Sequence, residues 1–405
     1  MKTNCLRIWL LLPDPYTQSM PARAAITEIY GNFLPKLGHK IVWITPGCEE
    51  SKFHYNDISV IALPYGQSTF LPKRFINLFH SLYKKYKIIK LGITTDGIDV
   101  IQVRNNIYDA LLAVYIKQKF NIPFVFQYSF PQLILKKEQA STFFEVLFNK
   151  VEYHILEYIF NQSDLILPIS DWMEDELILA GLKKTKLMVF PLGANIESFS
   201  PNNDGSKIKN MYSLYSYKII AYIGSLDKLR QLSIIILAFR KVQLKHSRTK
   251  LLIVGEGNDK NDLEKLSIEL GLQESIIFLG NVSYFDIPFF ISASDICLSP
   301  IPPTSIYKIS SPTKLFEYMA SGKPIIANQE ILEHKYVLES SNGGILVNYD
   351  ANQFAESIID LIEDPQRAAR LGNNGRIWVE KNRSYEAMAC LLEARYYTLI
   401  RTNKI

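Results

Sequence analysis

The sequence has few of the residues that build metal sites and disulfide frameworks. Four cysteines and six histidines occur among 405 residues. The cysteines Cys5, Cys48, Cys297 and Cys390 show no metal-ligand spacing, and four cysteines in so long a chain do not form a disulfide framework. We therefore expect reduced thiols, no bound metal, no organic cofactor and a cytoplasmic protein.

Long apolar runs and a glycine-rich dinucleotide loop are also missing. No stretch approaches the roughly 20 apolar residues that span a bilayer. The first apolar run, Leu6–Leu12, ends at Pro13 and is too short for a signal peptide, so we expect a buried strand there. No Gly-x-Gly-x-x-Gly follows it, which argues against a dinucleotide-dependent oxidoreductase. The net charge of +5 is modest and no RNA- or DNA-binding module appears, so nucleic acid is not an expected partner.

The sequence does contain a regular alternation of short apolar runs and amphipathic stretches of helical length. Apolar strands that alternate with helices are typical of parallel sheets covered on both faces. The Pro/Gly/Asn-rich segment from Pro191 to Gly205 indicates a linker, so we predict an α/β protein with lobes over residues 1–195 and 196–384. The predicted strands are Leu6–Leu12, Ile41–Thr45, Val100–Val103, Pro123–Gln127, Leu165–Pro168, Leu187–Phe190, Ile219–Gly224, Leu251–Gly255, Ile276–Leu279, Ile296–Ser299, Ile325–Ala327 and Ile345–Val347.

The segment Ser310–Ala327 has the clearest local signals. Ser311 suits a helix N-cap and Pro312 the first helical position. Gly322 suits the residue that follows a helix. The segment therefore predicts a capped helix of about three turns that begins in the loop after a buried strand.

This predicted helix begins where ligands bind in open parallel sheets, outside the carboxyl ends of the strands. Its free N–H groups and Lys314 suit a diphosphate. Glu317 lies one turn deeper on the same face and offers a carboxylate to a ribose diol. The alternative is that Lys314 and Glu317 form only a solvated i,i+3 pair.

The same segment resembles the donor-binding motif of the GT-B glycosyltransferases of family four, Ser-Pro-x-Lys-x-x-Glu followed by Ala-x-Gly-Lys-Pro. The resemblance covers the C-terminal half and is fainter over the first 190 residues. It implies two Rossmann-like lobes with a cleft between them and a C-terminal helix, residues 385–405, that returns to the N-terminal lobe. The other matching segments are Leu187–Asn195, Ile220–Leu226, Leu252–Gly257, Phe278–Val282 and Asn342–Val347.

Site residues follow from this resemblance. Arg230, Lys314 and Glu317 are the implied catalytic residues, with Arg230 and Lys314 on the donor diphosphate and Glu317 on the ribose. Val282 would lie against the base, and Gly224 would let the backbone approach the phosphates. The alternatives are an exposed loop charge for Arg230 and an ordinary strand-end turn for Gly224. The full donor-binding set is Gly224, Ser225, Arg230, Glu256, Val282, Ser311, Pro312, Thr313, Lys314 and Glu317.

The chain also departs from the family pattern. Ile309 stands where the family often has a Glu that contacts the transferred sugar, and Ser225 stands where an Arg often follows the glycine. Ser129 follows the strand after which a catalytic-site His is often found. These departures put the sugar contacts in doubt, and they motivate an alternative function as a non-catalytic partner subunit that binds nucleotide.

The N-terminal lobe offers fewer signals. Arg23, Arg104 and Ser129 are the predicted acceptor-binding residues. Arg23 is equally consistent with a surface arginine in the first turn of a helix. His39, in a Leu-Gly-His segment that precedes a strand, is predicted to be structural.

Residues 58–95 contain no acidic side chain but several lysines. Phe75, Leu82, Tyr86 and Ile89 repeat at helical spacing, with basic residues opposite. A basic amphipathic helix with aromatic residues over 71–92 suits an anionic membrane surface, and the alternative is a core helix with a solvated basic face.

Together these features predict a retaining glycosyltransferase that uses a UDP- or GDP-linked sugar and acts on a glycan or lipid-linked acceptor. We expect a cytoplasmic protein, peripheral on the inner face of the membrane if the basic helix binds lipid.

Overall fold

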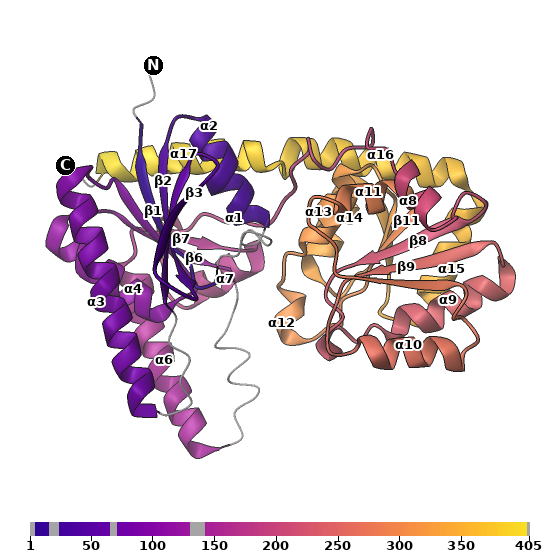
Figure 1. Ribbon diagram of the computed structural model, residues 1–405, viewed down its shortest axis with the longest axis horizontal. Helices are drawn as coiled ribbons and strands as arrows, with labels where there is room; N and C mark the ends of the chain where they lie inside the picture. Colours follow the sequence, from indigo (N-terminus) through magenta and orange to yellow (C-terminus); the bar gives the residue numbers. More distant parts are fainter. Residues whose placement is uncertain (1–4, 16–23, 65–70, 130–141, 403–405) are drawn as a thin grey trace. The chain divides into compact units, whose positions relative to one another are not determined.

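The computed structural model describes residues 5–15, 24–64, 71–129 and 142–402. The chain forms two compact units, one of residues 1–191 with 385–405 and one of residues 192–384 (Figure 1). The boundary predicted after residue 195 therefore falls inside the second unit. Leu192 N–H donates to Ser311 Oγ at 3.1 Å and Ala194 N–H to the Arg383 carbonyl at 3.0 Å, which joins this segment to the second unit.

The first unit contains a seven-stranded sheet in the order β3-β4-β2-β1-β5-β6-β7. All neighbours are parallel except the β3–β4 pair. Strands β1 and β5 lie at its centre and are almost wholly buried, as their continuous apolar runs predict. The strands are β1 (Arg7–Leu11), β2 (Lys40–Gly47), β3 (Ser51–Tyr55), β4 (Ile58–Pro64), β5 (Val100–Arg104), β6 (Phe124–Tyr128) and β7 (Leu165–Pro168).

In this unit one hairpin was missed and one predicted strand did not form. The residues of β3 alternate between half-buried and exposed and form no apolar run, whereas the largely buried apolar run of β4 was overlooked. The predicted strand Leu187–Phe190 forms only one isolated bridge, between Leu187 and Ile166 of β7. A 3-10 turn, η2 (Lys184–Lys186), immediately precedes it and leaves too short an extended segment for a strand.

The last helix, α17 (Tyr385–Thr402), belongs to the first unit, as predicted. Its Glu393 carboxylate lies 2.9 Å from His39 Nε2, while His39 Nδ1 accepts from the Leu6 N–H at 3.1 Å. These bonds confirm that His39 is structural. The other helical segments of this unit are α1 (Ala24–Glu28), η1 (Ile29–Phe33), α2 (Leu34–Lys36), α3 (Leu71–Thr95), α4 (Ile107–Phe120), α6 (Phe143–Gln162) and α7 (Asp171–Leu179).

The second unit contains a six-stranded, all-parallel sheet in the order β10-β9-β8-β11-β12-β13. This is the Rossmann order 3-2-1-4-5-6, and the first sheet repeats it once the antiparallel β3 is set aside. The predicted likeness between the two lobes is thus confirmed. The strands are β8 (Lys218–Ile223), β9 (Thr249–Val254), β10 (Ile276–Gly280), β11 (Ile296–Ser299), β12 (Ile325–Asn328) and β13 (Gly344–Val347).

Helices cover both faces of the second sheet, so that two apolar cores form. Along β8, Ile220 and Tyr222 enter one core, whereas Ile219, Ala221 and Ile223 enter the other. This alternation buries β8 from Ile219 to Ile223 and explains the continuous apolar sequence there. The helical segments are α8 (Ser206–Met211), η3 (Lys228–Arg230), α9 (Ser233–Lys245), α10 (Lys260–Glu269), α11 (Ile287–Ala293), α12 (Ser305–Lys308), α13 (Thr313–Ala320), α14 (Leu332–Ser341), α15 (Ala351–Glu363) and α16 (Pro365–Asn382).

Across the described residues, no helix combines the length and apolar character that a bilayer crossing needs.

Candidate nucleotide-sugar site

Helix α13 is shorter than predicted and begins differently. It has eight residues, about two turns, and Pro312 rather than Ser311 occupies the N-cap. Ser311 is buried, and its hydroxyl accepts from the Leu192 N–H instead of capping the helix. The first-turn N–H groups of α13 therefore have no side-chain cap. The end of the helix is as predicted, because Gly322 has a φ of +66° and its N–H donates to the Met319 carbonyl at 2.9 Å.

Glycines let the ends of three neighbouring strands lie close together beside this helix. Gly224 follows β8 with a φ of +153°, and a Cβ there would lie 2.6 Å from Lys314 Nζ. Gly255 follows β9, and a Cβ there would lie 1.9 Å from the Gly224 carbonyl oxygen. Gly224 N–H donates to the Val254 carbonyl and Gly255 N–H to the Gly280 carbonyl. Gly255 has no room for a side chain, because a Cβ there would meet the backbone of Gly224, whereas a Cβ at Gly224 would meet mainly the movable end of Lys314. The approach of the Gly224 backbone to the donor phosphates stays a prediction.

Lys314 points from the first turn of α13 toward the end of β8. Its Nζ lies 3.8 Å from the centroid of the Tyr222 ring, a cation–π contact. Among the residues that the structure describes, Lys314 makes no ion pair with a carboxylate. Burial lowers the pKa of Lys314 well below its usual value, the nearby Arg230 lowers it further, and Glu317 opposes both. Lys314 as a whole is half-buried.

Glu317 lies one turn deeper and is buried, with 7% of its surface exposed. Burial raises its pKa to about 7, while the Tyr284 hydroxyl and Lys314 act in the opposite direction. A carboxylate in this setting is not half of a solvated i,i+3 pair, so that alternative is wrong. A buried carboxylate of this kind suits a ligand that donates hydrogen bonds to it.

Arg230 ends the 3-10 turn η3 and is also not a free loop charge. Its guanidinium lies 4.7 Å from the centroid of the Tyr307 ring, and Gln231 after it has a φ of +47°. The turn η3 follows β8 closely in the chain, and a Cβ at Gly224, between the two, would lie 2.6 Å from Lys314 Nζ. Arg230 also lowers the pKa of Lys314. Gly224, Arg230, Lys314 and Glu317 are therefore brought together in one region of the second unit.

The remaining predicted donor-binding residues have fewer features of a binding site than Lys314, Glu317 and Arg230. Glu256 is exposed and its Oε1 lies 2.7 Å from Lys260 Nζ, so its carboxylate is already paired. Ser225 donates to the Asp227 carboxylate. Val282 and Thr313 are both half-buried, and Val282 packs against the core that contains α13. Ile309, at the position of the missing Glu, is buried.

Sequence reasoning missed the aromatic residues that support the charged ones. Tyr222 lies beneath Lys314, Tyr307 beneath Arg230, and Tyr284 beside Glu317. Each is distant in sequence from its partner or separated from it by a loop, so no local pattern could have identified it.

The predicted acceptor residues of the first unit are held by neighbours. Arg104 ends β5, is buried, and places Nη1 2.6 Å from Asp14 Oδ2. Ser129 follows β6, where its N–H donates to Asn105 Oδ1 and its hydroxyl accepts from Asn105 Nδ2. Arg23 lies outside the described residues.

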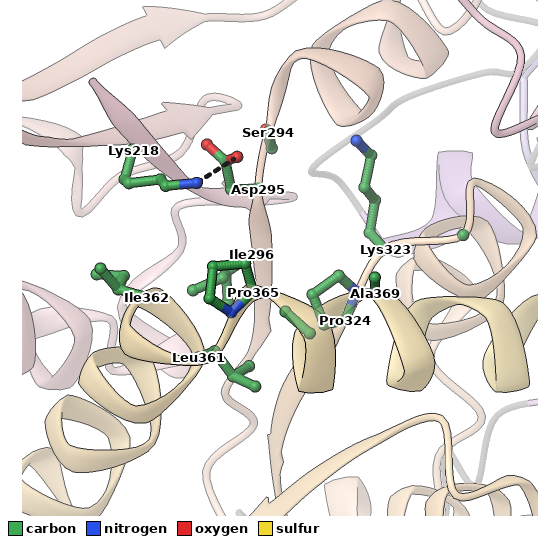
Figure 2. Close-up of a pocket in the computed structure, with 12 residues that line it drawn as sticks. Lys218, Ser294, Asp295, Ile296, Lys323, Pro324, Leu361, Ile362, Pro365 and Ala369 are labelled. Atoms are coloured by element: carbon green, nitrogen blue, oxygen red, sulfur yellow. Dashed lines mark ion pairs between the residues drawn. The ribbon is translucent and has the colours of Figure 1, made fainter. Parts of the chain in front are cut away.

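A pocket of about 200 Å³ lies at the opposite ends of the strands of the second sheet, near the amino ends of β8, β11 and β12 (Figure 2). Its charged groups are engaged, because Lys218 lies 3.6 Å from Asp295 and Lys323 donates to the Ser292 carbonyl at 2.8 Å. This pocket contains none of the predicted site residues. Within the described residues, no group of three or more His, Cys, Asp or Glu side chains could hold a metal ion.

Two Rossmann-type sheets in one chain, with cations beside an uncapped helix N-terminus in the second unit, are features expected of a GT-B nucleotide-sugar enzyme. The family model for glycosyl transferases group 1 matches residues 208–378, and that for glycosyltransferase family 4 matches residues 30–198. The chain belongs to the group 1 glycosyltransferases.

Curated relatives are distant and are matched over different shares of their length. The GDP-mannose-dependent α-(1-6)-phosphatidylinositol monomannoside mannosyltransferase of Mycolicibacterium smegmatis is 23% identical over 56% of this chain. The chain spans only 60% of that relative. The α-monoglucosyldiacylglycerol synthase of Streptococcus pneumoniae is 21% identical over 87% of this chain and 77% of its own.

Solved structures share the fold over nearly the whole chain. Sucrose-phosphate synthase from Thermosynechococcus elongatus superposes with a TM-score of 0.76, at 22% identity over 98% of this chain and 100% of its own. Anabaena HepE in complex with UDP-glucose gives a TM-score of 0.70, at 17% identity over 96% of this chain and 99% of its own.

Proposed function

We propose that this glycosyltransferase is a retaining enzyme that moves a sugar from a UDP- or GDP-linked donor to a hydroxyl of a glycan or lipid-linked acceptor. The pathway would be the biosynthesis of a cell-surface polysaccharide or glycolipid. The observation that carries the proposal is the pair of cations Arg230 and Lys314 beside the uncapped start of α13. Neither cation is paired with a carboxylate among the described residues, so both can bind the donor diphosphate.

The chemistry follows from where negative charge develops. The acceptor hydroxyl oxygen bonds to the anomeric carbon while the bond from that carbon to the β-phosphate oxygen breaks. The electron pair leaves with the diphosphate, which Arg230, Lys314 and the first-turn N–H groups of α13 stabilise. The hydroxyl proton passes to the departing phosphate oxygen. Because these groups are fixed cations and dipoles, the proposal requires no metal ion, and the retaining outcome is inferred from the resemblance of the donor motif.

The donor and acceptor classes rest on the relatives. One of them is named for a lipid acceptor, a phosphatidylinositol monomannoside, and another for a lipid product, monoglucosyldiacylglycerol. One structural neighbour is complexed with UDP-glucose. These names favour a lipid-linked acceptor, which we propose that Arg104 and Ser129 help to bind. From the resemblance of the donor motif, we propose that Glu317 binds the ribose diol.

Calorimetric titration of UDP, GDP and ADP into wild type and Glu317→Ala tests the donor site. We expect one nucleotide to bind wild type. Its binding free energy should weaken by roughly 1–3 kcal/mol in the variant, because a charge-assisted hydrogen-bond acceptor is lost. Glu339→Ala, which removes an exposed carboxylate of the same unit, is the matched control and should bind like wild type. Absence of binding by wild type would overturn the donor site and favour the partner-subunit alternative.

We also propose that α3 docks on an anionic membrane surface, which would place the protein on the inner face of the cell membrane. The exposed face of α3 is more apolar than predicted, because Ile76, Phe79, Tyr83 and Leu91 are all more than half exposed. Lys87 and Lys90 are also exposed. Apolar side chains beside cations suit a lipid headgroup region better than they suit a solvated face.

Two of the lysines of α3 do not contribute to such a surface. Lys84 Nζ lies 2.9 Å from Glu50, and the buried Lys85 lies 2.6 Å from Asp109. Tyr86 and Ile89 pack into the core of the first unit, as the alternative of a core helix expects, so they do not contribute to such a surface either. The side chains of residues 71–75, including Phe75, lie outside the described residues.

A further inference from the structure

Arg230 is the one predicted phosphate ligand that lies in a loop, and a loop cannot hold a guanidinium in place by itself. It ends the three-residue turn η3, and the next residue, Gln231, has a left-handed backbone with a φ of +47°. The backbone at 230–231 and the Arg230 side chain each have a partner from elsewhere in the second unit.

The backbone partner is Tyr349, which follows β13. The Tyr349 hydroxyl donates to the Gln231 carbonyl at 3.0 Å and lies 3.5 Å from the Arg230 carbonyl. Tyr349 is in turn held by Glu330, whose Oε1 accepts from the Tyr349 N–H at 2.8 Å.

The side-chain partner is Tyr307 in α12, whose ring lies under the guanidinium. The segment that leads into α12 leaves β11 at Ile301. There the Asn328 side chain accepts from the Ile301 N–H and donates to the Ile301 carbonyl, both at 2.9 Å.

Both supports meet at Asn328, the last residue of β12. Its Nδ2 also donates to Glu330 Oε2 at 2.9 Å, which links the clamp on Ile301 to the Glu330–Tyr349 pair. Asn328 is completely buried and its amide contacts both segments. A buried side chain with fixed hydrogen bonds is a rigid anchor for two loops that would otherwise move independently.

We infer that Asn328, Glu330 and Tyr349 are positioning residues that hold Arg230 ready for the donor diphosphate. This inference rests on the proposed function, because it presumes that Arg230 binds phosphate. The three residues do not touch the ligand. They act by keeping the backbone of residues 230–231 and the segment that carries Tyr307 at a fixed separation, which lowers the cost of ordering Arg230 on binding.

The test is a double-mutant cycle on nucleotide binding with Tyr349→Phe and Arg230→Ala. Tyr349→Phe removes only the hydroxyl, so we expect diphosphate binding, measured by calorimetry with the nucleotide that binds wild type, to weaken roughly three- to tenfold. In the Arg230→Ala background the same change should have no further effect, because the residue that it positions is gone. A merely structural role would weaken binding equally in both backgrounds.

The matched control is Tyr215→Phe, which removes a tyrosine hydroxyl that also donates to a backbone carbonyl, that of Ser206, at 3.4 Å in the same unit. We expect it to bind like wild type. Wild-type affinity in Tyr349→Phe, or additive losses in the cycle, would overturn the positioning role while leaving the donor site intact. If wild type binds no nucleotide, or if Arg230→Ala binds as wild type does, the proposed function of Arg230 fails and the positioning role fails with it.

Discussion

At the scale of single residues, the notable feature of the site is an excess of positive charge held in place by aromatic rings. Lys314 and Arg230 each lie over a tyrosine ring. Burial, and after it the positive charge of Arg230, lowers the pKa of Lys314. An anion between them would relieve this repulsion. A diphosphate has the charge to do so, because its oxygens can accept hydrogen bonds from both cations.

The raised pKa of Glu317 predicts how stability depends on pH. Between its ordinary value of 4.5 and about 7, the folded protein binds a proton at Glu317 that the unfolded chain has lost. Stability from this group therefore falls as pH rises through that window, by roughly 3 kcal/mol in total. Glu317→Gln, which stays neutral, should remove the fall, so its advantage over wild type should grow from pH 5 to pH 8 in urea-unfolding measurements.

Glu363 offers a matched comparison for that experiment. It is exposed and its pKa is lowered by Lys245 and His246 rather than raised, so Glu363→Gln should show no such growing advantage. Parallel stability profiles for wild type and Glu317→Gln would contradict the buried setting of Glu317.

At the scale of elements, prediction from sequence succeeded where one apolar pattern determined the structure. Strands β1 and β5 and the whole second sheet follow from continuous apolar runs, because both of their faces are covered. The hairpin strand β3 is covered on one face only, and its mixed sequence gave no such signal. The N-cap at Ser311 was predicted wrongly because a distant backbone group, Leu192 N–H, competes for its hydroxyl.

Prediction of the site was limited in the same way: features within one element could be predicted, whereas contacts between distant elements could not. Lys314 and Glu317 lie on one short helix, so their shared face could be predicted from spacing. Arg230 and Gly224 were assigned by resemblance. The supporting contacts of Tyr307, Tyr222 and Tyr349 join strand ends and loops that only the folded sheet brings together, and no sequence period encodes them.

The exposed face of α3 leads to a prediction at the scale of one element. Phe79→Ser together with Lys87→Gln should reduce co-sedimentation with phosphatidylglycerol vesicles severalfold, because both apolar insertion and headgroup attraction are lost. Wild type should bind phosphatidylcholine vesicles much less than phosphatidylglycerol vesicles.

Leu244→Ser with Lys241→Gln provides the control for that measurement, since Leu244 is a strongly exposed leucine of α9 in the second unit. It should sediment with anionic vesicles as wild type does. Equal binding by wild type and the α3 variant would count against membrane docking through this helix.

At the scale of the whole molecule, the two units share one sheet order but differ in how the chain completes them. The second unit is continuous, whereas the first needs α17 from beyond it. The buried Tyr396 hydroxyl of α17 donates to Gln102 Oε1, and Gln102 Nε2 donates to the Tyr30 hydroxyl at 2.6 Å. A buried polar network thus fastens the last helix to the first sheet.

This arrangement predicts which part of the molecule a change in α17 destabilises. Tyr396→Phe leaves the buried Gln102 oxygen without that donor, at a cost of roughly 1–3 kcal/mol. Tyr318→Phe, in the second unit, leaves the Ile223 N–H without the acceptor that lies 2.9 Å away. In scanning calorimetry we expect the two variants to lower different unfolding transitions. A shift of the same transition by both would contradict the assignment of α17 to the first unit.

The split composition of the first unit also has a consequence for synthesis. The sheet of the first unit is synthesised early, whereas α17 leaves the ribosome only after residues 192–384 have emerged. Until then His39 and Gln102 lack their partners from α17, and the surface that this helix covers is open to chaperones, proteases and other nascent chains. The helix that closes the first unit is thus translated after the whole second unit, so a chain truncated before α17 would carry a complete second unit and an unfinished first one.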